Sequence, residues 1–531
     1  MTWRQYLPLV LLGLLAAAFV AAFQPTPGYM DADYYYAGGM QLATGQGFTE
    51  PYLWNYLDDP AGLPHASHGY WMPLASLLAA AGAFLFGPGS WSAARIGFLA
   101  VSASIPPLTA ALAYSLTSRR ALALTSGLLA IFSGFYLIYL PVPDTFGIYI
   151  LLGGLFFLTA NHKRPSGTMH LSKTGFSIVN ALLLGLIAGL VHLARADGVL
   201  WLLVGFLAII FQPSSSRKSF PFYLLRCTFL VAGYLLVMAP WFLRNVSVFG
   251  SFLAPGGSKM LWLTAYDQIF TYPASQITFS AWWQSGMHAI LKVRAWALGL
   301  NLANAFTVQG GIFLWPLGLT GIWNLRHDRV VRLALLAWLL TLAAMTVVFP
   351  FAGGRGGFLH SGAAVQMVWW ALVPIGLDKV IDWGVRVRGW KPERARIVFP
   401  AILLALSALL TSVITAGRLG AGSGQAWGHE QAAYREVKEF LVSHGMSSGE
   451  VVIAANPPGF WLASGHPAIA LPDGDAQTVL ALSRRYGGRY LILEEGSVTK
   501  GLRGVYDHPD EFPGLRYLGE VEGARVFEIR P

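Results

Sequence analysis

The sequence of residues 6–36 reads YLPLVLLGLLAAAFVAAFQPTPGYMDADYYY, an apolar run that ends in an acidic, aromatic stretch. Residues 6–23 approach the length of about 20 residues that a transmembrane helix needs. No convincing small-residue cleavage site precedes Gln24-Pro25, so we expect a retained signal anchor. Asp31 and Asp33 then begin a polar loop, residues 24–91. Acidic side chains near lipid are costly, and a simple anchor would not need them, so we expect the chemistry in this loop.

The composition indicates a chain whose main solvent is a lipid bilayer. Of its 531 residues, 55% are hydrophobic and 12% are charged, and the mean hydropathy is +0.52. Soluble proteins carry about 25% charged residues. The net charge of +10 does not predict nucleic-acid binding, because Lys and Arg cluster between apolar stretches as they do in cytoplasmic loops. The lone Cys227 excludes a disulfide framework and a cysteine metal site.

The apolar stretches predict an α-helical polytopic membrane protein with about 11 transmembrane helices plus membrane-surface helices. With the N-terminus in the cytoplasm, every major basic cluster also falls in the cytoplasm, which is the positive-inside pattern. We therefore expect a multi-pass protein of the inner or plasma membrane. The expected spans are 6–23, 92–116, 121–140, 145–160, 176–193, 199–211, 222–241, 309–324, 333–350, 362–377 and 397–416.

The apolar segment 72–86 does not fit this topology as a span. If it crossed the membrane, every later loop would change sides and the basic clusters would face outward. We therefore expect a helix that lies on or dips into the outer leaflet. The alternative is that residues 72–87 span and that another span is miscounted.

Two domains are expected: a membrane domain over residues 1–416 and an extracytoplasmic α/β domain over residues 425–531. The second contains 14 acidic and 10 basic residues and no apolar run of membrane length. Its patterns predict helices at 434–444 and 476–486 and strands at 450–455 and 489–494, a β–α–β-like order.

Three acidic residues before that domain are candidates for catalysis. Asp31 and Asp33 follow the first span, and Asp144 follows the third, so all three are expected at the outer membrane surface. A carboxylate at this depth suits a general base, and it also suits a metal ligand. The structural alternative is that all three are helix caps that face water.

Candidate substrate-binding residues lie on the same predicted side. Arg195, Arg244 and Arg355 depart from the positive-inside pattern and could bind a lipid phosphate, although snorkelling or pairing of Arg195 with Asp197 would also explain them. His65 and His68 could donate a proton or contact phosphate, and without a third ligand they predict a metal site only weakly. Tyr70 belongs to an aromatic group that suits an interfacial belt or a sugar site: Tyr52, Trp54, Tyr56, Tyr70 and Trp71.

An ordered set of motifs over roughly residues 1–380 resembles GT-C glycosyltransferases. The resemblance is to the bacterial family 39 group, which includes protein O-mannosyltransferases and the lipid A aminoarabinose transferase. The matching motifs are Asp31-x-Asp33-Tyr34-Tyr35, Gly45-Gln46-Gly47-Phe48, Gly69-Tyr70-Trp71, Arg95, Arg119-Arg120, Asp144, Arg195-x-Asp197-Gly198, Pro240-Trp241-x-x-Arg244-Asn245 and Phe249-Gly250. The family usually has adjacent Asp and Glu, whereas Ala32 separates the two acids here.

The resemblance implies a GT-C-like membrane domain that takes a sugar from a polyprenyl-phosphate carrier at the outer face. It makes Asp31 and Asp144 the loop acids, and it favours a phosphate contact for His65. Expected partners are the donor, membrane lipids and an acceptor that is protein, lipid or glycan, with no nucleic acid. No cofactor is certain, and a divalent metal stays open. The competing functions are a lipid or sugar transporter or flippase, and a scaffold that displays the C-terminal domain.

Overall fold

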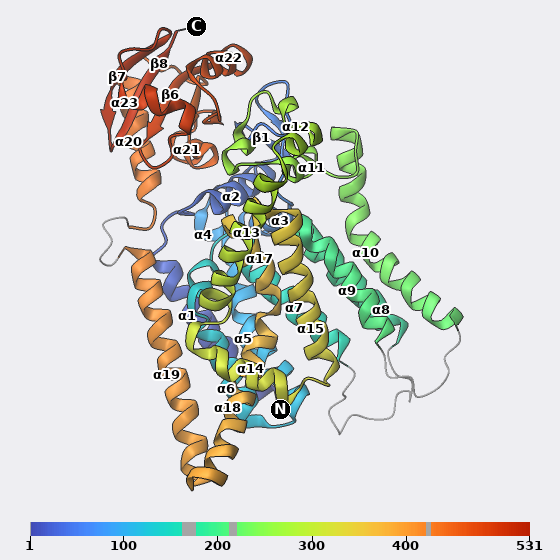
Figure 1. The fold of residues 1–531 in the computed structure, drawn as a ribbon. Helices are drawn as coiled ribbons and strands as arrows, with labels where there is room; N and C mark the ends of the chain where they lie inside the picture. The colour runs from blue at the N-terminus through green and yellow to red at the C-terminus, as the bar shows by residue number, and fades with distance from the viewer. Residues whose placement is uncertain (1, 162–176, 212–219, 421–425, 531) are drawn as a thin grey trace. The chain divides into compact units, whose positions relative to one another are not determined.

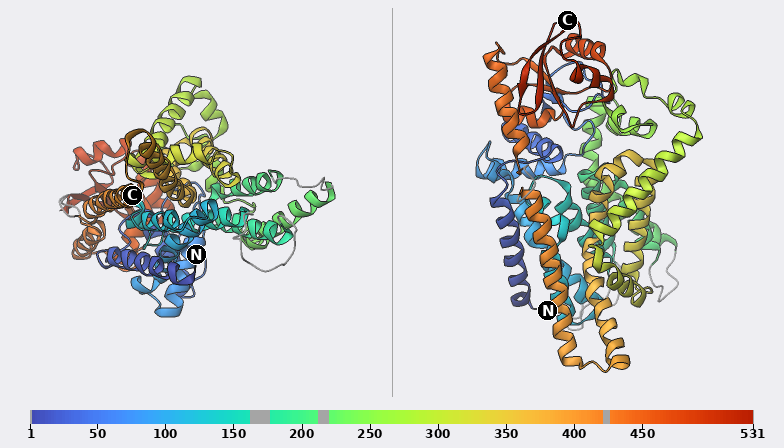
Figure 2. Two further views of the ribbon diagram at one scale, coloured as in Figure 1. Left: turned by 90° about the horizontal axis from the view of Figure 1, so that it is seen from below. Right: turned by 60° about the vertical axis from the view of Figure 1, so that its left-hand side comes forward.

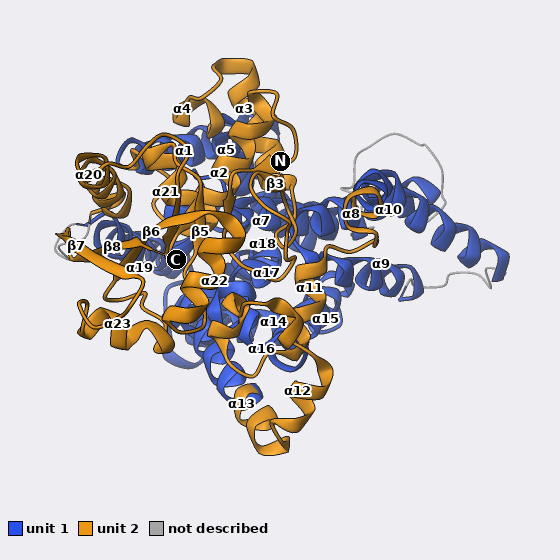
Figure 3. Ribbon diagram, turned by 90° about the horizontal axis from the view of Figure 1, so that it is seen from above, with its two compact units in different colours: residues 1–23, 96–244, 294–423 blue, residues 24–95, 245–293, 424–531 orange. Residues whose placement is uncertain are grey.

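The computed structural model describes residues 2–161, 177–211, 220–420 and 426–530 (Figure 1). Two compact units divide these residues (Figure 3). Unit 1 comprises residues 1–23, 96–244 and 294–423, and unit 2 comprises residues 24–95, 245–293 and 424–531. The basic clusters at 163–164 and 217–218, on which part of the expected topology depends, lie outside the described residues.

Unit 1 is a helical bundle whose apolar helices agree with most of the predicted spans. It contains α1 (Trp3–Ala22), α5 (Ile96–Thr117), α6 (Arg120–Ile131), α7 (Thr145–Ala160), α8 (Ile178–Ala194), α9 (Leu200–Ile210), most of α10 (Phe220–Phe249), α14 (Trp315–Asn324), α15 (Arg329–Ala343), α18 (Gln366–Arg388) and α19 (Pro392–Leu419). The last two run antiparallel as a hairpin (Figure 2). Large apolar side chains on α1, α10 and α19 are exposed, as lipid contact requires.

Among the described residues, six helices are long and apolar enough to cross a membrane by themselves, or seven if one bent pair counts as a span. The protein is therefore a multi-pass membrane protein. The expected total of about 11 additionally requires shorter apolar helices such as α6, α7, α8 and α9 to cross.

The bent pair contains a helix that the predicted spans omitted. α13 (Met287–Asn304) continues through a π-helical turn to Gln309, and Ile312–Asn324 follows at an angle of 85°. The expected span, 309–324, therefore covers only the second arm. Lys292 and Arg294 lower the apparent hydropathy of the first arm, which explains why a search for apolar runs missed it.

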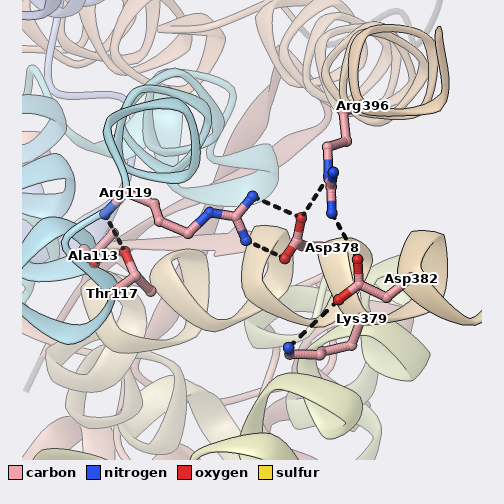
Figure 4. A network of polar contacts seen from close by, with 7 residues as sticks. All are labelled: Ala113, Thr117, Arg119, Asp378, Lys379, Asp382 and Arg396. Atoms are coloured by element: carbon pink, nitrogen blue, oxygen red, sulfur yellow. Dashed lines mark hydrogen bonds and ion pairs between the residues drawn. The ribbon is translucent and has the colours of Figure 1, made fainter. Parts of the chain in front are cut away.

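A cluster of charged side chains joins three helices of unit 1 (Figure 4). Asp378 of α18 is buried. Its carboxylate accepts hydrogen bonds from the two terminal guanidinium nitrogens of Arg119, the residue that precedes α6. In α19, Nε of Arg396 lies 3.4 Å from Oδ1 of Asp378, and Nη2 of Arg396 donates a hydrogen bond to Oδ1 of Asp382 at 2.7 Å. A bidentate guanidinium–carboxylate pair fixes geometry as well as charge, so this cluster holds α18 and α19 against the start of α6.

Unit 2 combines the segment after α1 with the C-terminal residues. Its first part contains α2 (Met30–Ala43), β1 (Thr49–Glu50), β2 (Tyr52–Leu53), β3 (His65–Ala66), α3 (Leu74–Phe86) and α4 (Trp91–Ala94). Its middle part contains α11 (Pro255–Lys259), the 3-10 turns η3 (Met260–Trp262), η4 (Tyr266–Phe270) and η5 (Ala274–Gln276), and α12 (Phe279–Gln284). β1 and β3 pair antiparallel.

A six-stranded sheet forms the core of unit 2, in the order β2-β5-β4-β6-β8-β7. Strands β2, β5, β4 and β6 are parallel, and β8 and β7 are antiparallel. α20 packs on one face of the sheet and α22 on the other. The C-terminal elements are α20 (His429–Ser443), β4 (Val451–Ala454), α21 (Pro457–Ser464), β5 (Ala468–Ala470), α22 (Ala476–Tyr486), β6 (Gly488–Glu494), α23 (Arg503–Asp507), β7 (Leu515–Val521) and β8 (Ala524–Ile529).

The four predicted elements of the C-terminal domain are present as α20, β4, α22 and β6. The edge strand β2 was not foreseen, because it comes from the loop 24–91, some 400 residues earlier in the chain. Tyr52 pairs with Ala468 and Leu53 with Ile469. The loop that was expected to belong with residues 1–416 thus shares a sheet and a compact unit with residues 426–530.

Helix α3 has 13 residues, which is about 20 Å at 1.5 Å per residue and short of a bilayer core of about 30 Å. Phe84, Leu85 and Phe86 are exposed at its end, and its small residues Ala75 and Ala79 are buried. This length suits the predicted surface helix better than a span.

Candidate functional site

Asp144 is the N-cap of α7 in unit 1. Its carboxylate accepts the backbone N–H of Thr145, and its side chain is 0% exposed. The preceding Pro141 and Pro143 cannot continue a helix, so α7 begins at Thr145. The helix-cap alternative for Asp144 is therefore observed, but this cap is buried rather than open to water.

His360 gives Asp144 an ionisable partner. In α17 (Phe358–Gly362), the Nδ1 atom of His360 lies 3.4 Å from Oδ1 of Asp144 and 3.0 Å from Oγ1 of Thr145. The imidazole stacks on Phe146 with ring centroids 3.7 Å apart, which fixes its orientation. Sequence analysis missed His360. The available signal was an ionisable residue within an apolar stretch, which is rare and often functional in membrane proteins.

Packing between helices sets the position of this Asp144–His360 pair. Gly153 and Gly154 of α7 lie so close to Ala364 and Met367 that a β-carbon at either glycine would clash with them. The two glycines therefore let the segment 358–367 approach α7 closely. His360 and Asp144 meet about two and a half turns nearer the N-terminus of α7.

Arg195 lies beside the same pair, between α8 and the turn η2 (Ala196–Val199). Its guanidinium pairs with Asp197 at 3.1 Å, as the structural alternative expected, and its positive charge also acts on His360. A β-carbon on Gly357 would lie 3.5 Å from Nη2 of Arg195. Unit 1 thus places Asp144, His360 and Arg195 next to the glycine-rich turn η9 (Gly353–Gly357).

The other two candidate arginines of unit 1 occupy separate settings. Arg355 is exposed at the centre of η9, where Gly356 has a φ of +118° that favours glycine. Arg244 lies near the end of α10, with its guanidinium 4.8 Å from the ring centroid of Trp241. The Trp241 ring thus orients the guanidinium of Arg244, whereas the Arg355 side chain extends from an exposed position.

Asp31 and Asp33 both lie in the first turn of α2 in unit 2, but their surroundings differ. Asp31 is half-buried, whereas Asp33 is 1% exposed. The Asp33 carboxylate accepts hydrogen bonds from Gln431 Nε2 at 2.5 Å and from Asn456 Nδ2 at 2.8 Å. These bonds attach α2 to α20 and to the start of α21.

Two further carboxylates complete this network, which we call the α2 carboxylate cluster: Asp33, Glu430 and Glu494. Asn456 Nδ2 also donates to Glu430 at 3.0 Å, and the Tyr434 hydroxyl donates to Glu494 at 2.8 Å. Burial, followed by the charge of Glu430, raises the pKa of Asp33 well above its usual value and that of Glu494 to about 7. Burial also raises the pKa of Glu430. These raised pKa values mean that burial disfavours the charged form of each carboxyl group, so protonation lowers the free-energy cost of placing three of them in one buried site.

His65 is enclosed by acidic partners in unit 2. Its Nε2 lies 3.2 Å from Glu50 and 3.0 Å from the Tyr52 carbonyl, and its Nδ1 lies 3.7 Å from Asp58. Burial raises the pKa of Asp58 to about 6. An anionic phosphate beside these carboxylates would be repelled, so the surroundings of His65 favour a structural role.

His68 and Tyr70 are also held by their own unit. Nδ1 of His68 bonds to Ser67 at 2.7 Å and Nε2 bonds to Ser76 at 3.1 Å, so both ring nitrogens are in use. Tyr70 packs edge-on to Trp54, which stacks on Trp71 with centroids 4.2 Å apart. Tyr52, Trp54 and Tyr56 are buried, so they form a protein core rather than the interfacial belt that was one of the two expectations for this aromatic group.

Comparison with solved structures identifies the fold. An archaeal oligosaccharyltransferase, AglB from Archaeoglobus fulgidus in complex with an inhibitory peptide and a dolichol-phosphate, has a TM-score of 0.57 and 13% identity, over 92% of this chain and 70% of that chain. ArnT from Cupriavidus metallidurans bound to undecaprenyl phosphate has a TM-score of 0.56 and 11% identity, over 99% of this chain and 98% of that chain. No protein-family model matches the chain, and no curated protein matches it significantly.

These two neighbours are GT-C glycosyltransferases, and the chain has the GT-C fold that the motifs predicted. A further Archaeoglobus fulgidus oligosaccharyltransferase structure is a complex with Zn and sulfate, with a TM-score of 0.54 and 12% identity, over 91% of this chain and 67% of that chain. At such identities the likeness shows the fold alone.

Proposed function

We propose that this protein is a membrane glycosyltransferase that moves a hexosyl or pentosyl group from a polyprenyl-phosphate donor to an acceptor at the outer membrane face. The observation that carries this proposal is the buried Asp144–His360 pair at the start of α7, in a chain with the GT-C fold. The lipid phosphates bound by AglB and ArnT support the class of donor.

A lipid phosphate is already a good leaving group, so the enzyme does not have to protonate it. What the transfer mainly needs is a base that removes the proton from the acceptor hydroxyl. Asp31, which is half-buried in the first turn of α2, serves as this base. Asp144, oriented by His360 and Thr145, assists by orienting the acceptor. Asp33, which the sequence grouped with these acids, positions α2 through Gln431 and Asn456.

Positive charge must stabilise the phosphate as the bond to the sugar breaks. Arg244, Arg355 and Arg195 are assigned to this role because a guanidinium donates two parallel hydrogen bonds to phosphate oxygens. The carboxylates around His65 oppose a phosphate there, so the proposal gives that role to the arginines alone.

A divalent metal fits the donor atoms of the Asp144–His360 pair, since carboxylate and imidazole both bind such ions. Bound there, it would supply positive charge to the departing phosphate. Removal by a chelator, followed by titration with Mg²⁺, Mn²⁺ or Zn²⁺, tests whether turnover needs an ion.

The first experiment uses purified protein in lipid with a panel of polyprenyl-phosphate sugars and follows release of the free carrier phosphate. Asp31→Asn is expected to lower turnover by 10² to 10⁴, the usual contribution of a positioned base. Asp59→Asn, an exposed acid of the same loop, is the matched control and should leave turnover unchanged.

Asp144→Asn separates helix capping from chemistry. Asparagine is as good an N-cap as aspartate, so the fold should persist while turnover falls at least tenfold. Undiminished activity in both Asp31→Asn and Asp144→Asn would contradict the proposed roles. Donor binding or movement across the membrane without release, with varied acceptors present, would favour the flippase alternative.

A further inference from the structure

Unit 2 contains a polar hollow that the proposed chemistry does not use. Its volume is about 260 Å³, and it is formed by the segment 262–282 and the loop that follows β5. The residues that line it include Trp262, Gln268, Thr271, Gln276, Trp282 and Asp473. All lie outside the segments that contain the candidate catalytic residues.

Backbone contacts build this hollow from the two segments. Asp473 N–H donates to the Phe270 carbonyl at 2.9 Å, and Thr271 and Asp473 form an isolated parallel bridge. Gln268 Oε1 accepts the backbone N–H groups of Thr264 and Ala265 at 2.7 and 3.1 Å. The Gln268 side chain is thereby fixed, and its Nε2 is the atom left to donate to a ligand.

Several polar side chains of the hollow form few hydrogen bonds with the rest of the protein. Within the described residues, no side chain or backbone group hydrogen-bonds to Gln268 Nε2, to the side-chain amide of Gln276 or to the Asp473 carboxylate. Burial, followed by the charge of Asp267, raises the pKa of Asp473. A set of oriented donors and acceptors that the fold does not need is what a ligand site provides.

Aromatic rings supply the second half of the recognition chemistry. Trp262 and Trp282 line the hollow, with ring centroids 5.7 Å apart and planes at 61°. Phe279 and Trp283 continue this aromatic surface outward and are 55% and 57% exposed. Such rings offer apolar faces to the C–H faces of a ligand beside polar edges.

The charges select against anions and against plain apolar chains. Asp473 lies in the hollow, the negative charge of Asp267 raises its pKa, and the positive charge of Lys500 acts in the opposite sense. A phosphate or carboxylate would meet net negative charge, and an acyl chain would leave the amides and the carboxylate without partners. A neutral ligand with many hydroxyl groups and an apolar face satisfies all of these groups, and that is a saccharide.

We propose that this hollow, formed by Trp262, Trp282, Gln268, Gln276, Thr271 and Asp473, is a saccharide-binding site that receives a sugar unit of the acceptor. As an acceptor site it rests on the proposed transferase function, and it names the acceptor as a glycan or glycolipid. Saccharide binding itself does not depend on that function.

The test measures equilibrium binding of methyl glycosides of glucose, galactose, mannose and N-acetylglucosamine to the full chain in lipid nanodiscs, without donor. Tryptophan fluorescence should change saturably with at least one of them. Asp473→Asn and Gln276→Leu should each weaken that binding about tenfold or more. Asp510→Asn and Gln284→Leu, exposed residues outside the hollow, are the matched controls and should bind normally.

Equal binding by all four variants would place the saccharide elsewhere and overturn the proposal. Absence of binding to the whole panel, and to disaccharides of the same sugars, would overturn it as well. In a working donor assay, Gln276→Leu should raise the KM for a glycan acceptor and leave kcat unchanged. Saccharide binding with no transfer from any donor would refute the transferase function while the site stands.

Discussion

At the scale of single residues, the α2 carboxylate cluster makes stability depend on pH. Glu494 has a pKa raised to about 7 by burial and by the charge of Glu430, against an ordinary value of 4.5. The folded state therefore binds more protons than the unfolded state between these two values. Stability falls as pH rises through this window, and the contribution is present in full only below about pH 4.5.

We predict that unit 2 unfolds more easily at pH 8 than at pH 5.5, with a difference of about 2 kcal/mol from Glu494. Glu494→Gln should remove much of this dependence, because a neutral amide needs no proton. Thermal unfolding of the membrane-embedded protein at several pH values measures this pH dependence of stability. Glu495→Gln is the matched control, and a pH dependence that Glu494→Gln leaves undiminished would contradict the assignment.

The division of labour between Asp31 and Asp33 also belongs to this scale. The sequence presents the two acids as near equivalents, two residues apart on one helix. Their surroundings differ because Asp33 accepts hydrogen bonds from Gln431 and Asn456. No local sequence pattern shows that these two residues are its partners. The pairing of His360 with Asp144 was missed for the same reason, since it joins residues 216 positions apart in the chain.

At the scale of elements, β2 connects the loop 24–91 to the sheet of unit 2. Leu53 is 2% exposed and packs into the apolar core with Ile469, Val479 and Leu491. A two-residue strand gives no alternating pattern, so sequence analysis could not find it.

We predict that Leu53→Ala lowers the free energy of unfolding of unit 2 by about 2–4 kcal/mol, the usual range for a buried leucine. Val442→Ala, an exposed apolar residue of α20, should change it by less than about 0.5 kcal/mol. Denaturant titration followed by hydrogen exchange in β4 and β5 measures the effect. Equal protection of these strands in both variants would contradict the role of β2.

The Asp378 cluster of unit 1 is a second test at this scale (Figure 4). Asp378→Ala leaves Arg119 and Arg396 without their shared acceptor and should destabilise the bundle by about 1–3 kcal/mol. Asp382→Ala removes a more exposed carboxylate and should have an effect below about 1 kcal/mol. Unfolding in detergent compares them, and equal effects would indicate that burial of Asp378 contributes nothing.

At the scale of the whole molecule, the orientation in the membrane remains the prediction of the positive-inside pattern. The lone Cys227 makes a labelling test simple, because a Cys227→Ser background has no thiol. Ser448→Cys in unit 2 and Asn324→Cys at the end of α14 are both at exposed positions.

We predict that a membrane-impermeant maleimide labels Ser448→Cys in intact cells and labels Asn324→Cys only after permeabilisation. If α3 spanned the membrane while the other spans stood, the two results would be exchanged. The labelling pattern therefore tests the C-terminal side and the surface position of α3 together. The Cys227→Ser background without a new cysteine controls for non-specific reaction.

The amino-acid sequence by itself showed that this protein is embedded in a lipid bilayer. It also predicted most of its membrane helices, four elements of its C-terminal domain and its GT-C fold. Each of these follows from local hydropathy, local periodicity or short ordered motifs. Only the tertiary structure decided that β2 belongs to the C-terminal sheet, that Asp33 bonds to Gln431 and Asn456, and that His360 pairs with Asp144. These contacts join residues hundreds of positions apart, and they form because burial forces each polar group to find a partner wherever the packed chain supplies one.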